Sequence, residues 1–137
     1  MSATAQVFSL PIRVYFQDTD AGGVVYHAAY VNFLERARTE WLRDSYGYSN
    51  AGLMKEFGVV FVVRTLQLDY LRPALLDDLL EVSAQLKEIG RSSVTLQQSV
   101  MRAGETLLKA EIRLVCVALE NFKPVSVPEI LREQWKV

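Results

Sequence analysis

The chain has 137 residues, half of them hydrophobic, so one domain over residues 1–137 can bury a core without disulfides or metal. Its net charge is −1, from 15 basic and 16 acidic residues with no long run of either sign. This balance argues against binding to nucleic acid or to a charged membrane surface.

Cysteine usage and the first residues favour a cytoplasmic protein. Cys116 is the single cysteine, so no internal disulfide can form, as expected in a reducing compartment. The opening MSATAQVFSL lacks the basic start and long apolar run of a secretory signal. The longest aliphatic and aromatic run, Val59 to Val63, is too short to be a transmembrane segment.

The first elements in chain order are a strand and two helices. Phe8, Leu10, Ile12 and Val14 alternate with more polar residues, which predicts a strand. Pro11 within it lacks an N–H donor and therefore belongs at a sheet edge or at an unpaired position. From about residue 28, apolar residues recur at helical spacing, namely Tyr30, Phe33, Leu34, Ala37, Trp41 and Leu42. We expect this helix to end at Gly47, and a shorter helix over residues 50–57 to close at Gly58.

Alternation then returns and predicts four more strands, over residues 59–70, 80–87, 92–101 and 106–119, with turns at Gly90 and Ala103–Gly104. Pro128 opens a short terminal helix. One strand, one long helix and four strands predict an α+β domain in which an antiparallel sheet wraps around the helix, because no other element is large enough to cover the sheet. The exposed edge strands invite pairing with a second copy, so we expect a dimer.

The candidate chemistry lies in FQDTDAGGVVYHAAYVNFLERAR, residues 16–38, which holds the chain's sole histidine, His27. A carboxylate such as Asp18 or Asp20 can act as a general base or as a nucleophile. Gly22 and Gly23 can take positive φ and let a ligand approach the backbone. The N-terminus of the following helix can stabilise a developing oxyanion, so the combination suits acyl transfer to water.

Each of these residues also has an ordinary structural explanation. Either aspartate could serve as a turn or cap residue, the histidine as a hydrogen-bonding partner and the glycine pair as a plain turn. The aromatic residues of the long helix are expected in the core, and Cys116 is expected to be a small buried apolar residue. No phosphate-binding glycine loop occurs, and one His with one Cys offers no metal cluster, so we expect neither a metal nor a cofactor.

The phrase RVYFQDTDAGGVVYHAAYVNFLERARTEWL closely resembles the signature of hotdog-fold acyl-CoA thioesterases of the 4-hydroxybenzoyl-CoA thioesterase type. It is most similar to their tol-pal system-associated (YbgC) branch, which FVVRTLQLDYLRPALLDDLLEV and LLKAEIRLVCV also match in order and position. The resemblance covers roughly residues 12–128. It implies an α+β hotdog fold, a five-stranded antiparallel sheet around one long helix, with dimers or dimers of dimers that join two sheets.

The resemblance also implies the site. It assigns catalysis to Asp20 and places His27 beside it. In this branch, a tyrosine just before the acidic pair is also discussed as part of the site. This chain has Phe16 at that position, with Tyr15 as its neighbour. The other residues expected to bind substrate are Gly22, Gly23 and Val24 of the loop, Val62 and Val63 near the partner and the acyl pocket, and Arg91, Ser92 and Ser93 as phosphate contacts in a turn.

The activity expected from the resemblance is hydrolysis of an acyl-CoA or acyl-carrier-protein thioester to acid and thiol. Two alternatives remain open. The first is a non-catalytic acyl-binding or scaffolding protein linked to the Tol–Pal envelope system, peripheral to the inner membrane. The second is a hotdog dehydratase, which needs a histidine placed to remove a proton next to the carbonyl, and the loop motif argues against it.

Overall fold

An antiparallel sheet is the framework of the computed structural model, which describes residues 6–135. Its strands run in the spatial order β1-β3-β4-β5-β2. The strands are β1 Phe8–Arg13, β2 Val59–Tyr70, β3 Leu79–Ile89, β4 Ser93–Arg102 and β5 Glu105–Ala118. All neighbouring strands pair antiparallel. The five-stranded sheet predicted from the resemblance is therefore confirmed.

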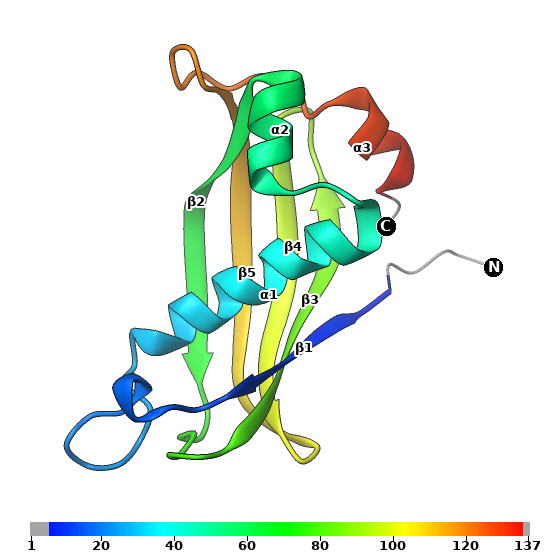
Figure 1. The fold of residues 1–137 in the computed structure, drawn as a ribbon. Helices are drawn as coiled ribbons and strands as arrows, with labels where there is room; N and C mark the ends of the chain where they lie inside the picture. Colours follow the sequence, from blue (N-terminus) through cyan, green and yellow to red (C-terminus); the bar gives the residue numbers. More distant parts are fainter. Residues whose placement is uncertain (1–5, 136–137) are drawn as a thin grey trace.

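The long helix α1, Ala29–Tyr46, lies across one face of the sheet and contacts β1, β3 and β4 (Figure 1). Six of its side chains, at the positions predicted from helical spacing, are buried against the strands: Tyr30, Phe33, Leu34, Ala37, Trp41 and Leu42. Gly47 ends the helix with a φ of 76°, a conformation that glycine adopts without strain. The predicted α+β domain with one covering helix is confirmed.

Three shorter helical segments complete the chain. The 3₁₀ segment η1, Phe16–Asp18, precedes the candidate loop, and α3, Glu129–Gln134, follows Pro128 as predicted. Helix α2, Asn50–Phe57, has the predicted bounds, and its N-cap Ser49 accepts a 2.9 Å bond from the Gly52 amide. Among residues 6–135, no helix is long and apolar enough to cross a membrane.

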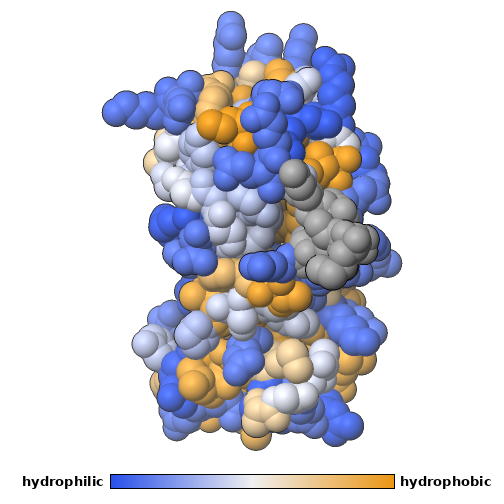
Figure 2. Space-filling model, turned by 90° about the vertical axis from the view of Figure 1, so that its right-hand side faces the viewer, coloured by the Kyte–Doolittle hydropathy of each residue, from blue (hydrophilic) through white to orange (hydrophobic). Residues whose placement is uncertain are grey.

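The two edge strands differ in what they expose. β1 carries Pro11 and is an edge strand, as predicted. The molecular side that carries α3 and the start of β1 shows small hydrophobic spots scattered among hydrophilic residues (Figure 2). The other edge strand, β2, leaves Val62 37% and Val63 47% exposed. Five consecutive apolar residues, 59–63, favour a strand end that is covered on both faces, and a single chain does not provide that cover.

Candidate active site

Both aspartates of the candidate loop make local bonds to the backbone. One carboxylate oxygen of Asp18 accepts the Tyr15 amide at 2.8 Å and fixes the turn of η1. Oδ1 of Asp20 accepts the Gly22 amide at 2.8 Å. Asp18 is half-buried, whereas Asp20 is exposed. The Asp20 carboxylate is thus exposed and bonded to one backbone amide.

The two glycines have different roles, and only one of them uses the positive φ that glycine can adopt. Gly23 has a φ of 78°, which strains any residue with a side chain. Gly22 lies outside the positive-φ region. A Cβ atom at Gly22 would lie 3.3 Å from Oδ1 of Asp20. Gly22 therefore keeps space next to the carboxylate.

The segment between β2 and β3 holds the candidate loop in place through its backbone. The Val25 amide donates to the Ala74 carbonyl at 2.9 Å, and Val24 forms a bridge with Leu75. The Leu76 amide donates to the Gly23 carbonyl at 3.3 Å. Residues 23–25 are therefore attached to a segment about fifty positions further along the chain.

Two tyrosine hydroxyls add to this attachment. Tyr70, the last residue of β2, donates to the His27 carbonyl at 2.7 Å. The buried Tyr30 hydroxyl accepts the Ala74 amide at 2.9 Å, and the two rings pack edge to face. Burial raises the pKa of both tyrosines, so both hydroxyls stay protonated at neutral pH. Together they fix the backbone just before α1.

An ion pair also stabilises the segment between β2 and β3. Arg102 donates to the Asp78 carboxylate at 2.7 Å and to the Pro73 carbonyl at 3.3 Å. Partial burial opposes ionisation of Asp78, but the bonds from Arg102 and from the Leu75 amide together lower its pKa. Asp78 is therefore ionised at neutral pH and bonded to the segment that carries the loop.

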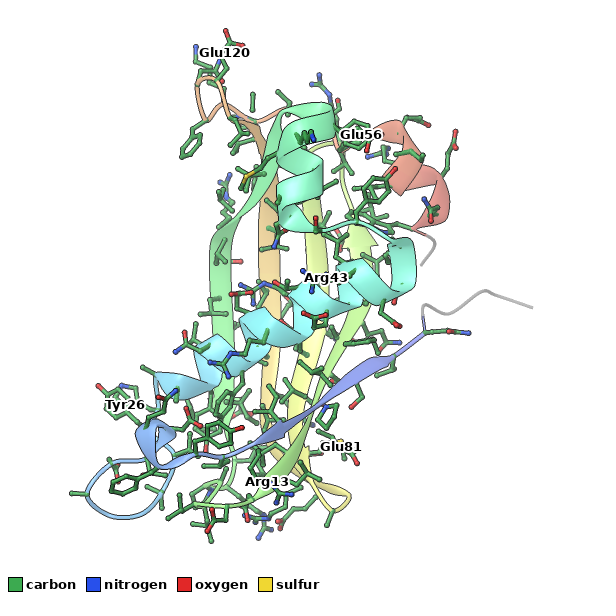
Figure 3. The ribbon with its side chains drawn as sticks, in the orientation of Figure 1. Arg13, Tyr26, Arg43, Glu56, Glu81 and Glu120 are labelled. Carbon is green, nitrogen blue, oxygen red and sulfur yellow. The ribbon has the colours of Figure 1, made fainter. Side chains whose placement is uncertain are left out.

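His27 lies at the entrance to α1 with an exposed side chain. Its ring contacts the Tyr26 ring at a centroid distance of 4.5 Å. Tyr26 lies at the lower end of the molecule, beside the start of α1 (Figure 3). Within residues 6–135, no hydrogen bond joins the His27 ring to the Asp20 carboxylate. The helix N-cap, Ala28, supplies no side-chain cap. In the first turn, the Ala29 amide donates to the Tyr26 carbonyl at 2.8 Å and the Val31 amide to the Ala28 carbonyl at 3.2 Å.

Apolar and aromatic side chains are exposed on the candidate loop and on the segment that holds it. Tyr15 is 62% and Phe16 82% exposed, and Val24 is half-buried. Further exposed residues come from the end of β2 and the segment after it: Tyr70, Leu71, Leu75 and Leu76. An apolar group brought to Asp20 would find partners here.

A cavity of about 280 Å³ lies near the other end of β2, between that strand, α1 and α2. Its walls are mainly apolar and include Val60, Phe61 and Val63, whereas Val62 is not among them. Arg38 of α1 also lines the cavity, which the sequence pattern did not predict. The sequence does show an arginine among the apolar residues of a predicted helix. A solvent-exposed arginine gives the same pattern, so the position of Arg38 at the cavity could not be predicted.

The predicted phosphate contacts lie far from the loop within one chain. The turn between β3 and β4 is at the upper end of the molecule beside α3, whereas residues 20–27 are at the lower end (Figure 1). Arg91 donates from Nε to the Ser126 hydroxyl at 3.0 Å. The Ser92 carbonyl accepts the Cys116 amide at 2.7 Å, and Ser93 starts β4. A single chain does not bring these residues to Asp20.

Cys116 takes no part in the candidate site. Its side chain is fully buried in β5, and burial raises the pKa of its thiol to about 11. The thiolate, which is the reactive form, is therefore scarce at neutral pH. The prediction of a small buried apolar residue is confirmed.

Comparison with known proteins identifies the class of protein to which this chain belongs. The Thioesterase superfamily profile matches residues 22–109, which include the end of the candidate loop and α1. A probable thioesterase from Bartonella henselae superposes with a TM-score of 0.85 at 32% identity, over 90% of this chain and 100% of that one. A mutant 4-hydroxybenzoyl-CoA thioesterase in complex with 4-hydroxybenzoyl-CoA has the same fold, with a TM-score of 0.88 at 21% identity over 95% of this chain and 99% of that one.

The chain belongs to the thioesterase superfamily, with the hotdog architecture of these enzymes. Its sequence relatives are more specific. The acyl-CoA thioesterase YbgC of Haemophilus influenzae is 47% identical over 89% of each chain. The acyl-CoA thioester hydrolase YbgC of Escherichia coli O6:H1 is 45% identical over 95% of this chain and 96% of that one.

Proposed function

We propose that this protein hydrolyses acyl-CoA thioesters at the loop that carries Asp20. The observation that carries the proposal is an exposed carboxylate, bonded to the Gly22 amide, on the loop that leads into α1. The names of the YbgC relatives support a thioester substrate that contains coenzyme A. An acyl-carrier-protein thioester has the same reacting group and is a second substrate to examine.

In the proposed reaction, a water molecule attacks the thioester carbonyl carbon. Asp20 takes a proton from the water, a C–O bond forms, and the carbonyl oxygen becomes an oxyanion at the start of α1. Amides at such a position lower the barrier by about 3 kcal/mol per donor. The C–S bond then breaks, and the thiolate leaves without much acid assistance because thiols have a pKa of about 8.5. In this proposal His27 orients the water or the carbonyl, and direct attack by Asp20 is the alternative first step.

The active unit in this proposal is a homodimer formed through β2. A two-fold axis pairs two copies of the strand antiparallel, so the N-terminal half of one lies against the C-terminal half of the other. The loop with Asp20 is attached at the C-terminal end of β2, and the cavity lies at its N-terminal half. Pairing would therefore bring the loop of one protomer toward the cavity of its partner. The exposed Val62 and Val63 would be covered at the same time.

We also infer a cytoplasmic location, where acyl-CoA is available and where the buried, free thiol of Cys116 stays reduced.

The test compares two substitutions that keep the local bonds. Asparagine at position 18 or 20 retains an oxygen that can accept the Tyr15 or Gly22 amide, but removes the negative charge. We expect Asp20→Asn to lower kcat by about a hundredfold or more with folding intact, and Asp18→Asn to lower it much less. Turnover is measured with a chromogenic thiol trap. Wild-type turnover in Asp20→Asn would refute the assignment, and binding of acyl-CoA without any turnover in the native protein would favour a scaffold.

A further inference from the structure

Arg38 lines the cavity between α1 and β2, and one of its guanidinium nitrogens is unpaired. Its Nη1 is buried and has no hydrogen-bond partner among the described residues. The cavity around it is lined by apolar side chains such as Phe61, Leu96 and Leu114. A buried donor without a partner is costly, and a buried charge without a counter-ion is more costly still.

The carboxylate closest along the helix does not satisfy this charge. Glu35 also lines the cavity, but no ion pair forms between it and Arg38, and Glu35 accepts the hydroxyl of Thr39. Burial lowers the pKa of Arg38, and the charge of Glu35 opposes that effect only in part. The guanidinium remains charged at neutral pH because its pKa starts far above it. Thr39 and Asn50, which also line the cavity, are polar but neutral.

We propose that this cavity receives an acyl group that ends in a carboxylate, and that Arg38 pairs with that carboxylate. The inference rests on the proposed function, since the acyl group enters the cavity from a thioester held at the partner's Asp20. A carboxylate is favoured over a neutral acceptor because it accepts hydrogen bonds from the guanidinium and also neutralises its charge. Its two oxygens match the planar fork of the guanidinium. Arg38 is then a specificity-determining residue and takes no part in the bond changes.

Two small thioesters of nearly equal shape test this proposal. Succinyl-CoA ends in a carboxylate, and 4-methylpentanoyl-CoA carries an isopropyl group in the same place. We expect the native dimer to have the higher kcat/KM for succinyl-CoA. Arg38→Met keeps much of the side-chain volume without donor or charge, and should lower kcat/KM for succinyl-CoA by about ten- to a hundredfold while sparing or improving 4-methylpentanoyl-CoA. Arg38→Lys, which keeps the charge without the fork, should fall between them.

Arg36→Met is the matched control, because Arg36 is an exposed residue of the same helix and does not line the cavity. It should leave the preference unchanged. Circular dichroism and sedimentation confirm that each variant is folded and has the native assembly state.

The possible outcomes separate this inference from the proposed function. Equal loss of activity on both thioesters in Arg38→Met, or a native preference for the neutral one, would overturn the inference while hydrolysis itself stands. If Arg38→Met instead dissociates the dimer and lowers both activities together, the acceptor belongs to the second copy of the chain and the inference is wrong. Failure of the proposed function would look different, since neither thioester would be hydrolysed by the native protein.

Discussion

At the residue scale, one hydroxyl links the end of a strand to the entrance of the long helix. Tyr70 donates to the His27 carbonyl across 43 positions of the chain, and its ring packs against Tyr30. The bond constrains the backbone that leads from Asp20 into α1. Tyr70 does not need to touch the substrate for this effect, so we regard it as a positioning residue.

Tyr70→Phe should keep the ring contact and lose only this bond. We expect kcat to fall about tenfold with a much smaller change in KM, because the loop would still bind substrate but orient it less well. The loss of one bond should lower the free energy of unfolding by about 1 kcal/mol. Steady-state kinetics and urea denaturation measure both. Tyr48→Phe, on a ring that packs on Phe57, is the control, and an equal fall in kcat there would contradict a specific role for Tyr70.

At the element scale, the parts that could be predicted are those with a local pattern. The alternating residues of β2 and the glycines after α1 and α2 give correct bounds, because a strand period and a left-handed cap depend on neighbouring residues. Other strand ends are displaced by one or two residues, as at β3 and β4. Pairing between distant segments could not be predicted in this way. Neither the attachment of residues 23–25 to residues 74–76 nor the partial burial of Arg38 leaves a periodic signal.

The turn between β3 and β4 is predicted to contact the phosphates of the nucleotide part of coenzyme A. Arg91 is exposed, and its Nε bond to Ser126 leaves the rest of the fork available to a phosphate. Arg91→Ala should raise KM for an acyl-CoA by about tenfold and leave a pantetheine thioester, which lacks the nucleotide phosphates, unaffected. A parallel rise in KM for both thioesters would instead indicate a structural role, since Arg91 is also tied to the segment before α3.

At the scale of the whole molecule, the two edges of the sheet have opposite properties. At one edge, β1 contains a proline and borders a surface on which hydrophobic and hydrophilic residues are mixed (Figure 2). At the other edge, β2 is longer, and its exposed side chains include Val62, Val63 and Leu66. A long apolar edge strand is an aggregation hazard unless another strand covers it. The two ends of this strand also carry the two halves of the proposed site, so covering the edge and completing the site would be the same event.

Val62→Glu tests this coupling, because Val62 lies on the edge strand but does not line the cavity. A carboxylate there would be buried against the partner's strand in the dimer, at a cost of several kcal/mol for each unpaired charge. We expect the variant to sediment as a folded monomer with turnover reduced about a hundredfold. Ser9→Glu places the same charge on the exposed edge strand β1 and should change neither property. A Val62→Glu monomer with full turnover would show that one chain holds a complete site, and dissociation caused by Ser9→Glu would move the interface to the opposite edge of the sheet.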